Sequence, residues 1–301
     1  MTVEAISYEE LHADPEMYLG KLAHEVRISP NNVNVVQTLA EALLETGNAE
    51  KAVSHILHAI KLDSKGELGD AKFLWAGQIF GGRKGLQYFE TGVNNLLNKL
   101  NQVAKTDTAT AEVYKKLLCQ AYLGMIEIWM TDLCMEPEAE QRCEQLISEA
   151  FLCRETDPEA WSVLGSIRIS QIKPVEATNA LEKSWTLFQQ SLLSDEIVDY
   201  SIVSKLVRLA QNMLEMRMFQ EVLQVCGEVY RLDDQVCDLY YLNCLSHAEL
   251  IKISQSEEEV QAHIEAAQEC LTLLEEVKDK EQEIVEAVQE IVKTLPVKSE
   301  S

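Results

Sequence analysis

The sequence predicts an all-α fold in which pairs of helices stack side by side, and three observations support this prediction. A 34-residue spacing recurs along the chain, and its clearest copy covers residues 158–191. The composition favours helices, with many Ala, Leu and Glu residues but only 12 Gly and 6 Pro among 301 residues. Hydrophobic residues make up 47% of the chain, which is enough for a large core. These features together indicate an α-solenoid, whose repeats each pack only on their neighbours.

The copy at residues 158–191 has the signature of a tetratricopeptide repeat. Six residues stand at the fourth, seventh, eighth, twentieth, twenty-fourth and twenty-seventh positions, namely Trp161, Leu164, Gly165, Ala177, Leu181 and Ser184. Small residues at the eighth and twentieth positions let two helices approach closely, and the larger ones fill the space between repeats. Such repeats stack into a right-handed superhelix of antiparallel helix pairs, whose inner groove can hold another polypeptide. We therefore expect a binding protein.

The amino-terminal half is predicted to contain a helical lead-in and two repeats. Residues from about 7 to 28 form either one amphipathic helix or two short ones, and Pro30 ends this segment. The first full repeat covers residues 33–66, with a tight turn at Gly47-Asn48. A degenerate repeat follows, with its first helix around Phe73 and its second around Phe89. Residues 98–109 are predicted to be a polar connection before a long helix over residues 111–133.

The carboxy-terminal half continues the same register. Pro137 suits the first turn of a helix that is expected over residues 138–153, and the repeat at residues 158–191 follows directly. An insertion of eleven residues precedes a repeat at 203–236, and another repeat starts at Cys237 with an acidic loop near residues 254–259. A helix over residues 279–294 has one apolar face, as a terminal capping helix should. We expect one superhelical domain over residues 1–295, with about six helix pairs, and a disordered acidic tail at 296–301.

The charge balance restricts the class of partner. The chain has 26 basic and 50 acidic residues, which gives a net charge of −24. Phosphates would be repelled, so direct binding to nucleic acid is disfavoured, and so is binding to an acidic membrane surface. No stretch approaches the ~20 apolar residues of a membrane span. A strongly basic protein is the natural complement, although acidity can also serve solubility alone.

The sequence carries no recognisable catalytic chemistry. His55 and His58 share a helix face without a third ligand at metal-binding spacing, and the glycines of residues 77–85 lack the Gly-Lys-Ser/Thr ending of a phosphate-binding loop. The eight cysteines lie in apolar helical patterns, which favours reduced, buried thiols and an intracellular protein. The first residues show no basic and apolar regions of a signal peptide. We therefore expect neither an enzyme nor a bound cofactor or metal.

The repeat register also predicts where a partner would bind. The first helix of each pair lines the groove, through the second, fifth, ninth, twelfth and thirteenth positions of the repeat. The candidate partner-binding residues are Glu41, Glu45, Glu159, Gln211, Glu215, Asp238, Tyr241 and Glu249. The groove positions include no basic residue, which argues against a clamp for acidic peptide termini and favours an extended basic segment with apolar anchors. The competing interpretation is that these side chains are simply solvated.

Several local strings together resemble one family. Residues 130–144 read Met-Thr-Asp-Leu-Cys-Met-Glu-Pro-Glu-Ala-Glu-Gln-Arg-Cys-Glu, residues 157–161 read Asp-Pro-Glu-Ala-Trp, and residues 77–82 read Gly-Gln-Ile-Phe-Gly-Gly. With Ile-Arg-Ile-Ser-Gln at 167–171 and Leu-Tyr-Tyr-Leu at 239–242, they resemble the fungal assembly chaperones dedicated to large-subunit ribosomal protein L4. The resemblance runs from about residue 33 to residue 250.

The resemblance implies a function that fits the acidic groove. Such a chaperone captures the newly made basic ribosomal protein L4, shields its long basic loop and escorts it to the nucleus for assembly into pre-ribosomes. The protein would then occur in the cytoplasm and the nucleus, and it would meet the nuclear import machinery through its cargo. The alternative is a scaffold subunit of a multiprotein complex, in which the repeats hold other components together.

Overall fold

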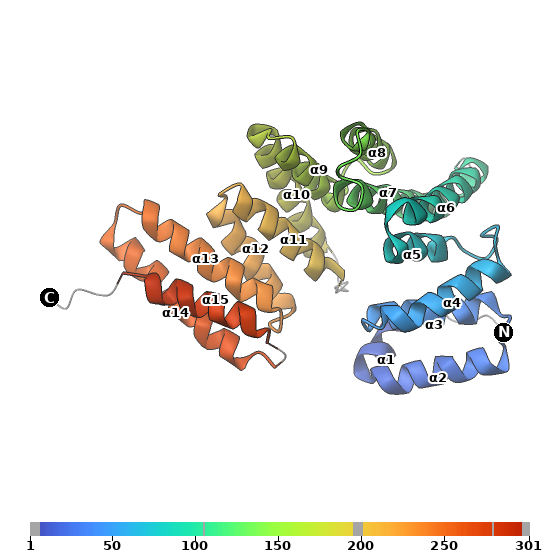
Figure 1. The fold of residues 1–301 in the computed structure, drawn as a ribbon, viewed down its shortest axis with the longest axis horizontal. Helices are drawn as coiled ribbons and strands as arrows, with labels where there is room; N and C mark the ends of the chain where they lie inside the picture. The colour runs from blue at the N-terminus through green and yellow to red at the C-terminus, as the bar shows by residue number, and fades with distance from the viewer. Residues whose placement is uncertain (1–6, 105, 195–200, 279, 297–301) are drawn as a thin grey trace. The chain divides into compact units, whose positions relative to one another are not determined.

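The structure, a computed structural model, describes residues 7–104, 106–194, 201–278 and 280–296. All regular secondary structure within these ranges is helical, in fifteen α-helices, and this confirms the predicted fold class (Figure 1). The chain divides into two compact units, Met1–Glu155 and Thr156–Ser301. The single superhelical domain over residues 1–295 stays a prediction. Residues 297–301 of the predicted tail lie outside the described residues.

The first unit contains eight helices that pack as consecutive pairs. They are α1 (Tyr8–Ala13), α2 (Pro15–Ile28), α3 (Val33–Glu45), α4 (Ala49–Leu62), α5 (Ala71–Phe80), α6 (Gly82–Val103), α7 (Thr108–Met130) and α8 (Ala139–Cys153). The lead-in is two helices rather than one, because Asp14 interrupts it. The Asp14 carboxylate accepts a hydrogen bond from the Met17 amide at 2.9 Å, and Pro15 occupies the first turn of α2.

One part of the predicted organisation of this unit is wrong. The connection expected at residues 98–109 is helical over its first half, since α6 continues to Val103. Leu96, Leu100 and Val103 keep the spacing of a helix face, and Leu96 is fully buried. The loop that remains is short, and Asp107 caps α7 by accepting a hydrogen bond from the Thr110 amide at 3.0 Å.

Glycines let the helices of the first unit approach one another around Phe89. A β-carbon added at Gly77 on α5 would lie 2.5 Å from the Phe89 ring, and one added at Gly124 on α7 would also lie 2.5 Å from it. The ring therefore sits between two helix backbones that only glycine allows so close. This contact joins α5, α6 and α7 into one core.

The loop between α4 and α5 is held by a buried ion pair. Lys72 is fully buried, and its ammonium group donates to the Asp63 carboxylate at 2.9 Å. Asp63 also accepts hydrogen bonds from the amides of Glu67 and Leu68, each at 2.9 Å. Burial by itself raises the pKa of Asp63, but the hydrogen bonds from Lys72, Leu68 and Glu67 outweigh it and hold the pKa below its ordinary value.

The second unit contains seven helices. They are α9 (Pro158–Ser170), α10 (Pro174–Ser194), α11 (Ser201–Glu215), α12 (Phe219–Leu232), α13 (Cys237–Ile253), α14 (Glu257–Glu276) and α15 (Gln282–Thr294). Six of them form consecutive pairs, and α15 packs against α13 and α14 (Figure 1). The predicted close crossing within the repeat at residues 158–191 is confirmed, because a β-carbon added at Gly165 would lie 2.5 Å from the Leu181 side chain.

The acidic loop predicted near residues 254–259 is shorter than expected. Helix α14 already begins at Glu257, so that the loop consists of residues 254–256. Ser256 caps the helix, its hydroxyl accepting a hydrogen bond from the Glu259 amide at 3.5 Å. The carboxylates of Glu257, Glu258 and Glu259 lie in the first turn, where the helix dipole favours negative charge.

Three turns between paired helices share one geometry. Gly47, Ile172 and Arg217 follow the ends of α3, α9 and α11 with φ values of 71°, 57° and 60°. In each turn this residue donates its N–H to the carbonyl three residues back, and the next residue donates to the carbonyl five residues back, as Lys173 does to Arg168 at 2.9 Å. All three residues hold the fifteenth position of the 34-residue register, but only the first is glycine.

Candidate functional site

In the second unit, the first helices of the three pairs form one wall. Helix α11 packs against both α9 and α13, while α10, α12 and α14 pack behind them as the second helices of their pairs. Six candidate partner-binding residues lie on this wall, namely Glu159, Gln211, Glu215, Asp238, Tyr241 and Glu249. The register thus distributes these residues over three adjacent helices of one unit.

Polar side chains link α9 to α11 across the wall. Glu159, in the first turn of α9, forms an ion pair with Lys205 of α11 at 3.0 Å, and both side chains are about 30% exposed. Two turns further along each helix, the Asn212 amide donates a hydrogen bond to the Ser166 hydroxyl at 2.8 Å. Gln211 and Glu215 lie on the same helix as Asn212 and are exposed. This half of the wall therefore combines an internal ion pair with open polar side chains.

The α13 part of the wall carries a second group of charges. Glu249 contacts Lys252 one turn away and lies 3.8 Å from the Arg217 guanidinium. Asp238 and Tyr241 are half-buried, and the Tyr241 ring packs against the hydrophobic core of the unit. Tyr241 is thus placed to offer an apolar contact beside carboxylates.

The groove positions named from the sequence contain no basic residue, but the structure adds basic neighbours. Lys205, Arg217 and Lys252 contact two of the candidate carboxylates, Glu159 and Glu249. Sequence reasoning missed them because the register selects positions on one helix and does not pair positions between helices. Lys205 is nevertheless only one residue from the groove position at Ser204, which is the signal that could have found it.

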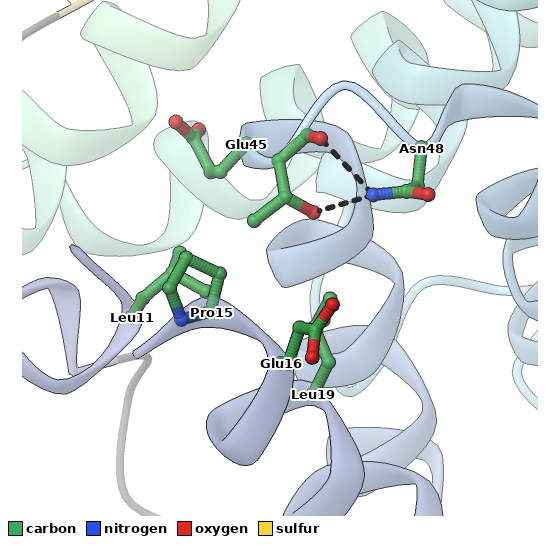
Figure 2. Close-up of a pocket in the computed structure, with 7 residues that line it drawn as sticks. Leu11, Pro15, Glu16, Leu19, Glu45 and Asn48 are labelled. Atoms are coloured by element: carbon green, nitrogen blue, oxygen red, sulfur yellow. Dashed lines mark hydrogen bonds between the residues drawn. The ribbon is translucent and has the colours of Figure 1, made fainter. Parts of the chain in front are cut away.

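The first unit holds the remaining two candidates on α3. Glu41 is half-buried, and Glu45 is the exposed last residue of the helix. Gln37, one turn before Glu41, donates a hydrogen bond from its amide to the Leu68 carbonyl at 3.1 Å and so fixes the loop between α4 and α5. Glu45 lines a cavity of about 430 Å³ beside the start of α2 (Figure 2).

Four buried cysteine thiols are poor nucleophiles. Burial raises the pKa of Cys226 and of Cys270 to about 12, and that of Cys143 and Cys244 to about 11. A thiol reacts as the thiolate, so these groups stay protonated and unreactive near neutral pH. They contribute to the core as small hydrophobic side chains.

The histidine pair considered from the sequence is engaged in packing. His58 donates a hydrogen bond from its ring to the Pro30 carbonyl at 2.8 Å. Burial, followed by the neighbouring His58, lowers the pKa of His55. Among the described residues, no group of three or more His, Cys, Asp or Glu side chains could hold a metal ion. A membrane span would need a longer and more apolar helix than any that these residues form.

The helix pairs have small residues at their crossings, and they stack so that their first helices form one polar wall. This arrangement defines a binding protein of the tetratricopeptide-repeat class. Two solved structures with low sequence identity share this fold. A complex described as the APC/C hetero-tetramer Cut9-Hcn1 matches over 92% of this chain with a TM-score of 0.53 at 10% identity. The nuclear import adaptor Nro1 also matches over 92%, with a TM-score of 0.52 at 12% identity.

Two curated proteins are more closely similar. A probable assembly chaperone of rpl4 from Schizosaccharomyces pombe is 32% identical over 234 residues, which is 74% of this chain and 67% of that protein. A protein of the same description from Emericella nidulans is 32% identical over 241 residues, covering 76% of this chain and 59% of that protein. The chain therefore spans about two thirds or less of the length of these relatives. No protein-family profile matches it.

A solved structure agrees with these relatives. The Assembly Chaperone of RpL4 (Acl4), residues 1–338, is 26% identical, with a TM-score of 0.67 over 79% of this chain and 92% of that one. The chain belongs to the family of assembly chaperones of RpL4. The resemblance seen in the local strings is thereby confirmed.

Proposed function

We propose that this chain is a dedicated chaperone that binds newly synthesised ribosomal protein L4, through its long basic loop, on the polar wall formed by α9, α11 and α13. The observation that carries the proposal is the gathering of six candidate residues on three adjacent first helices of one unit, in a chain of the RpL4 chaperone family. The net charge of −24 supports a basic cargo. The role is binding rather than catalysis.

The charges of the wall suggest how a basic segment would bind. Glu215 and Gln211 are exposed, and Asp238 is half-buried, so these side chains can receive Lys or Arg groups with little rearrangement. Glu159 already pairs with Lys205, so a cargo cation there must share or exchange that partner. Each exposed pair contributes only about 0.2–1 kcal/mol, and affinity then depends on several pairs together with apolar contacts such as Tyr241.

Escort of the cargo to the nucleus is a further part of the proposal. The chaperone would act in the cytoplasm and the nucleus and would reach the import machinery with its cargo. It would hold the basic loop away from nucleic acid until assembly, since a shielded cation cannot bind a phosphate. Wall carboxylates and phosphates thus compete for the same basic side chains.

Removing wall charges tests the proposed site. The Glu215→Gln/Asp238→Asn variant should bind purified ribosomal protein L4 about three- to tenfold more weakly than the unaltered chain at low salt. At high salt, which screens the charges, the difference in affinity between the two should be smaller. A matched control, Glu182→Gln/Glu275→Gln, removes two exposed charges from the second helices α10 and α14. Equal affinities of the folded wall variant and the control would place the site elsewhere. Absence of L4 binding by the unaltered chain, with recovery of several unrelated proteins from cell extract, would favour the scaffold alternative.

A further inference from the structure

The cavity at the start of the first unit has a composition of its own. Its lining consists of Leu11, Pro15, Glu16, Leu19, Glu45, Thr46 and Asn48. These residues come from α1, from the first turns of α2, and from the turn between α3 and α4 (Figure 2). Leu11, Pro15 and Leu19 supply its apolar lining, and Glu16 of α2 together with the residues of the α3–α4 turn supplies its polar lining. At about 430 Å³, the cavity is of the size that proteins use for small ligands, about 300–1,000 Å³.

The side-chain donors of this cavity are used within the protein. The Thr46 hydroxyl donates to the Ala42 carbonyl at 2.8 Å, and the Asn48 amide donates to the Thr46 carbonyl and hydroxyl at 3.0 and 3.1 Å (Figure 2). The Asn48 carbonyl oxygen and the Glu16 carboxylate make no hydrogen bond or ion pair with the other described residues. The hydrogen-bonding groups that the lining side chains can still offer to a ligand are therefore acceptors.

The side chains give the cavity a negative charge. Glu16 and Glu45 are both exposed carboxylates, and no Lys or Arg lines the cavity. The ends of four helices meet here, the carboxy termini of α1 and α3 and the amino termini of α2 and α4, so that the helix dipoles oppose one another and do not decide the sign of the potential. Two carboxylates at the rim repel anions and attract cations.

We propose that this cavity is an anchor site for one arginine or lysine side chain of the bound basic protein. The aliphatic stem of such a residue would pack on Leu11, Pro15 and Leu19, while its charged head would meet Glu16 and Glu45. Guanidinium and ammonium groups are donors only, which complements a lining that offers acceptors. The proposal deepens the proposed function by naming a residue type and a place, and it rests on that function for the identity of the cargo.

The first experiment uses the cargo and two variants of one helix. Glu16→Gln should weaken the binding of purified ribosomal protein L4 about two- to fivefold at low salt. Glu25→Gln is the control, because Glu25 is exposed on the same helix α2 but does not line the cavity. An equal effect of the two substitutions, with both variants folded, would overturn the proposal even if the unaltered chain binds L4 tightly.

The second experiment needs no cargo and decides the question if L4 does not bind. N-acetyl-L-arginine amide is titrated into the full chain, and the methyl resonances of Leu11 and Leu19 are followed by NMR. They should shift with arginine amide, shift less with the neutral citrulline analogue, and respond about two- to fivefold more weakly in Glu16→Gln. Absence of shifts with arginine amide, or equal shifts with citrulline amide, would overturn the anchor site and leave the proposed function standing on L4 binding alone.

Discussion

Replacement of Ile172 by glycine should stabilise the protein. Ile172 occupies the turn between α9 and α10 with a φ of 57°, in the left-handed region that disfavours β-branched residues. Its side chain is 88% exposed, so little packing is lost when it is removed. The equivalent turn after α3 contains Gly47 at a φ of 71° with the same pair of backbone hydrogen bonds. The change therefore keeps the turn and removes its strain.

The magnitude follows from two opposing terms. Holding an ordinary residue in the left-handed conformation costs about 1–2 kcal/mol. Glycine gains more freedom than other residues in the unfolded chain, which costs about 0.5–1 kcal/mol. The net expectation for Ile172→Gly is a gain of about 0.5–1 kcal/mol in the free energy of unfolding. Arg217→Gly should gain less, because Arg217 also contacts Glu249 and lies 5.8 Å from the Phe219 ring.

Urea denaturation measures this gain. The midpoint should rise by a few tenths of a molar unit, given a slope of about 1–3 kcal/mol per molar urea. Ile172→Ala separates the two causes, since it removes the side chain but stays strained, and it should recover only part of the gain. Gly47→Ala should destabilise by a similar amount. A midpoint for Ile172→Gly at or below that of the unaltered protein would refute the reasoning.

Three further predictions concern the core and pH. Gly124→Ala should destabilise the protein by about 1–3 kcal/mol, because the new β-carbon meets the Phe89 ring, and the better helix propensity of alanine offsets part of this loss. Thermal unfolding measures the change, and an unchanged midpoint would contradict the prediction. Lys72→Met should cost about 3–5 kcal/mol by leaving the buried Asp63 carboxylate without its ammonium partner, and a urea midpoint near normal would argue against this pair. Burial, and then the neighbouring His263, lowers the pKa of His247 to about 4. The unfolded chain therefore binds a proton at this group more readily, and the free energy of unfolding falls as the pH is lowered from about 6.5 toward 4. His247→Asn should flatten the dependence of the free energy of unfolding on pH in that window, as measured by urea denaturation.

Local patterns carried most of the fold prediction. The 34-residue register located the pairs α3–α4, α9–α10 and α11–α12, because the large and small positions of a repeat act between helices that are neighbours in sequence. Gly165 and Leu181 illustrate this, since their contact lies within one repeat. The sequence did not predict that α6 extends to Val103, because the polar residues between Leu96 and Val103 obscure the periodicity of its apolar face. That face packs against α7.

The candidate site was predictable only in part. The register placed six residues on α9, α11 and α13, but the partners of Glu159 and Glu249 depend on how neighbouring repeats pack. Glu159 and Lys205 are 46 residues apart, beyond the reach of any helical spacing. The pairing became visible only when α9 and α11 were placed side by side.

The sequence by itself determined the helices, their pairing and the acidic character of the chain, because periodicity, capping residues and net charge are properties of short segments or of composition. Only the tertiary structure decided which carboxylates are already paired, that Ile172 occupies a left-handed turn, and that Glu16 and Glu45 border one cavity. Such features arise where segments distant in sequence come into contact, and a one-dimensional pattern does not encode those distances.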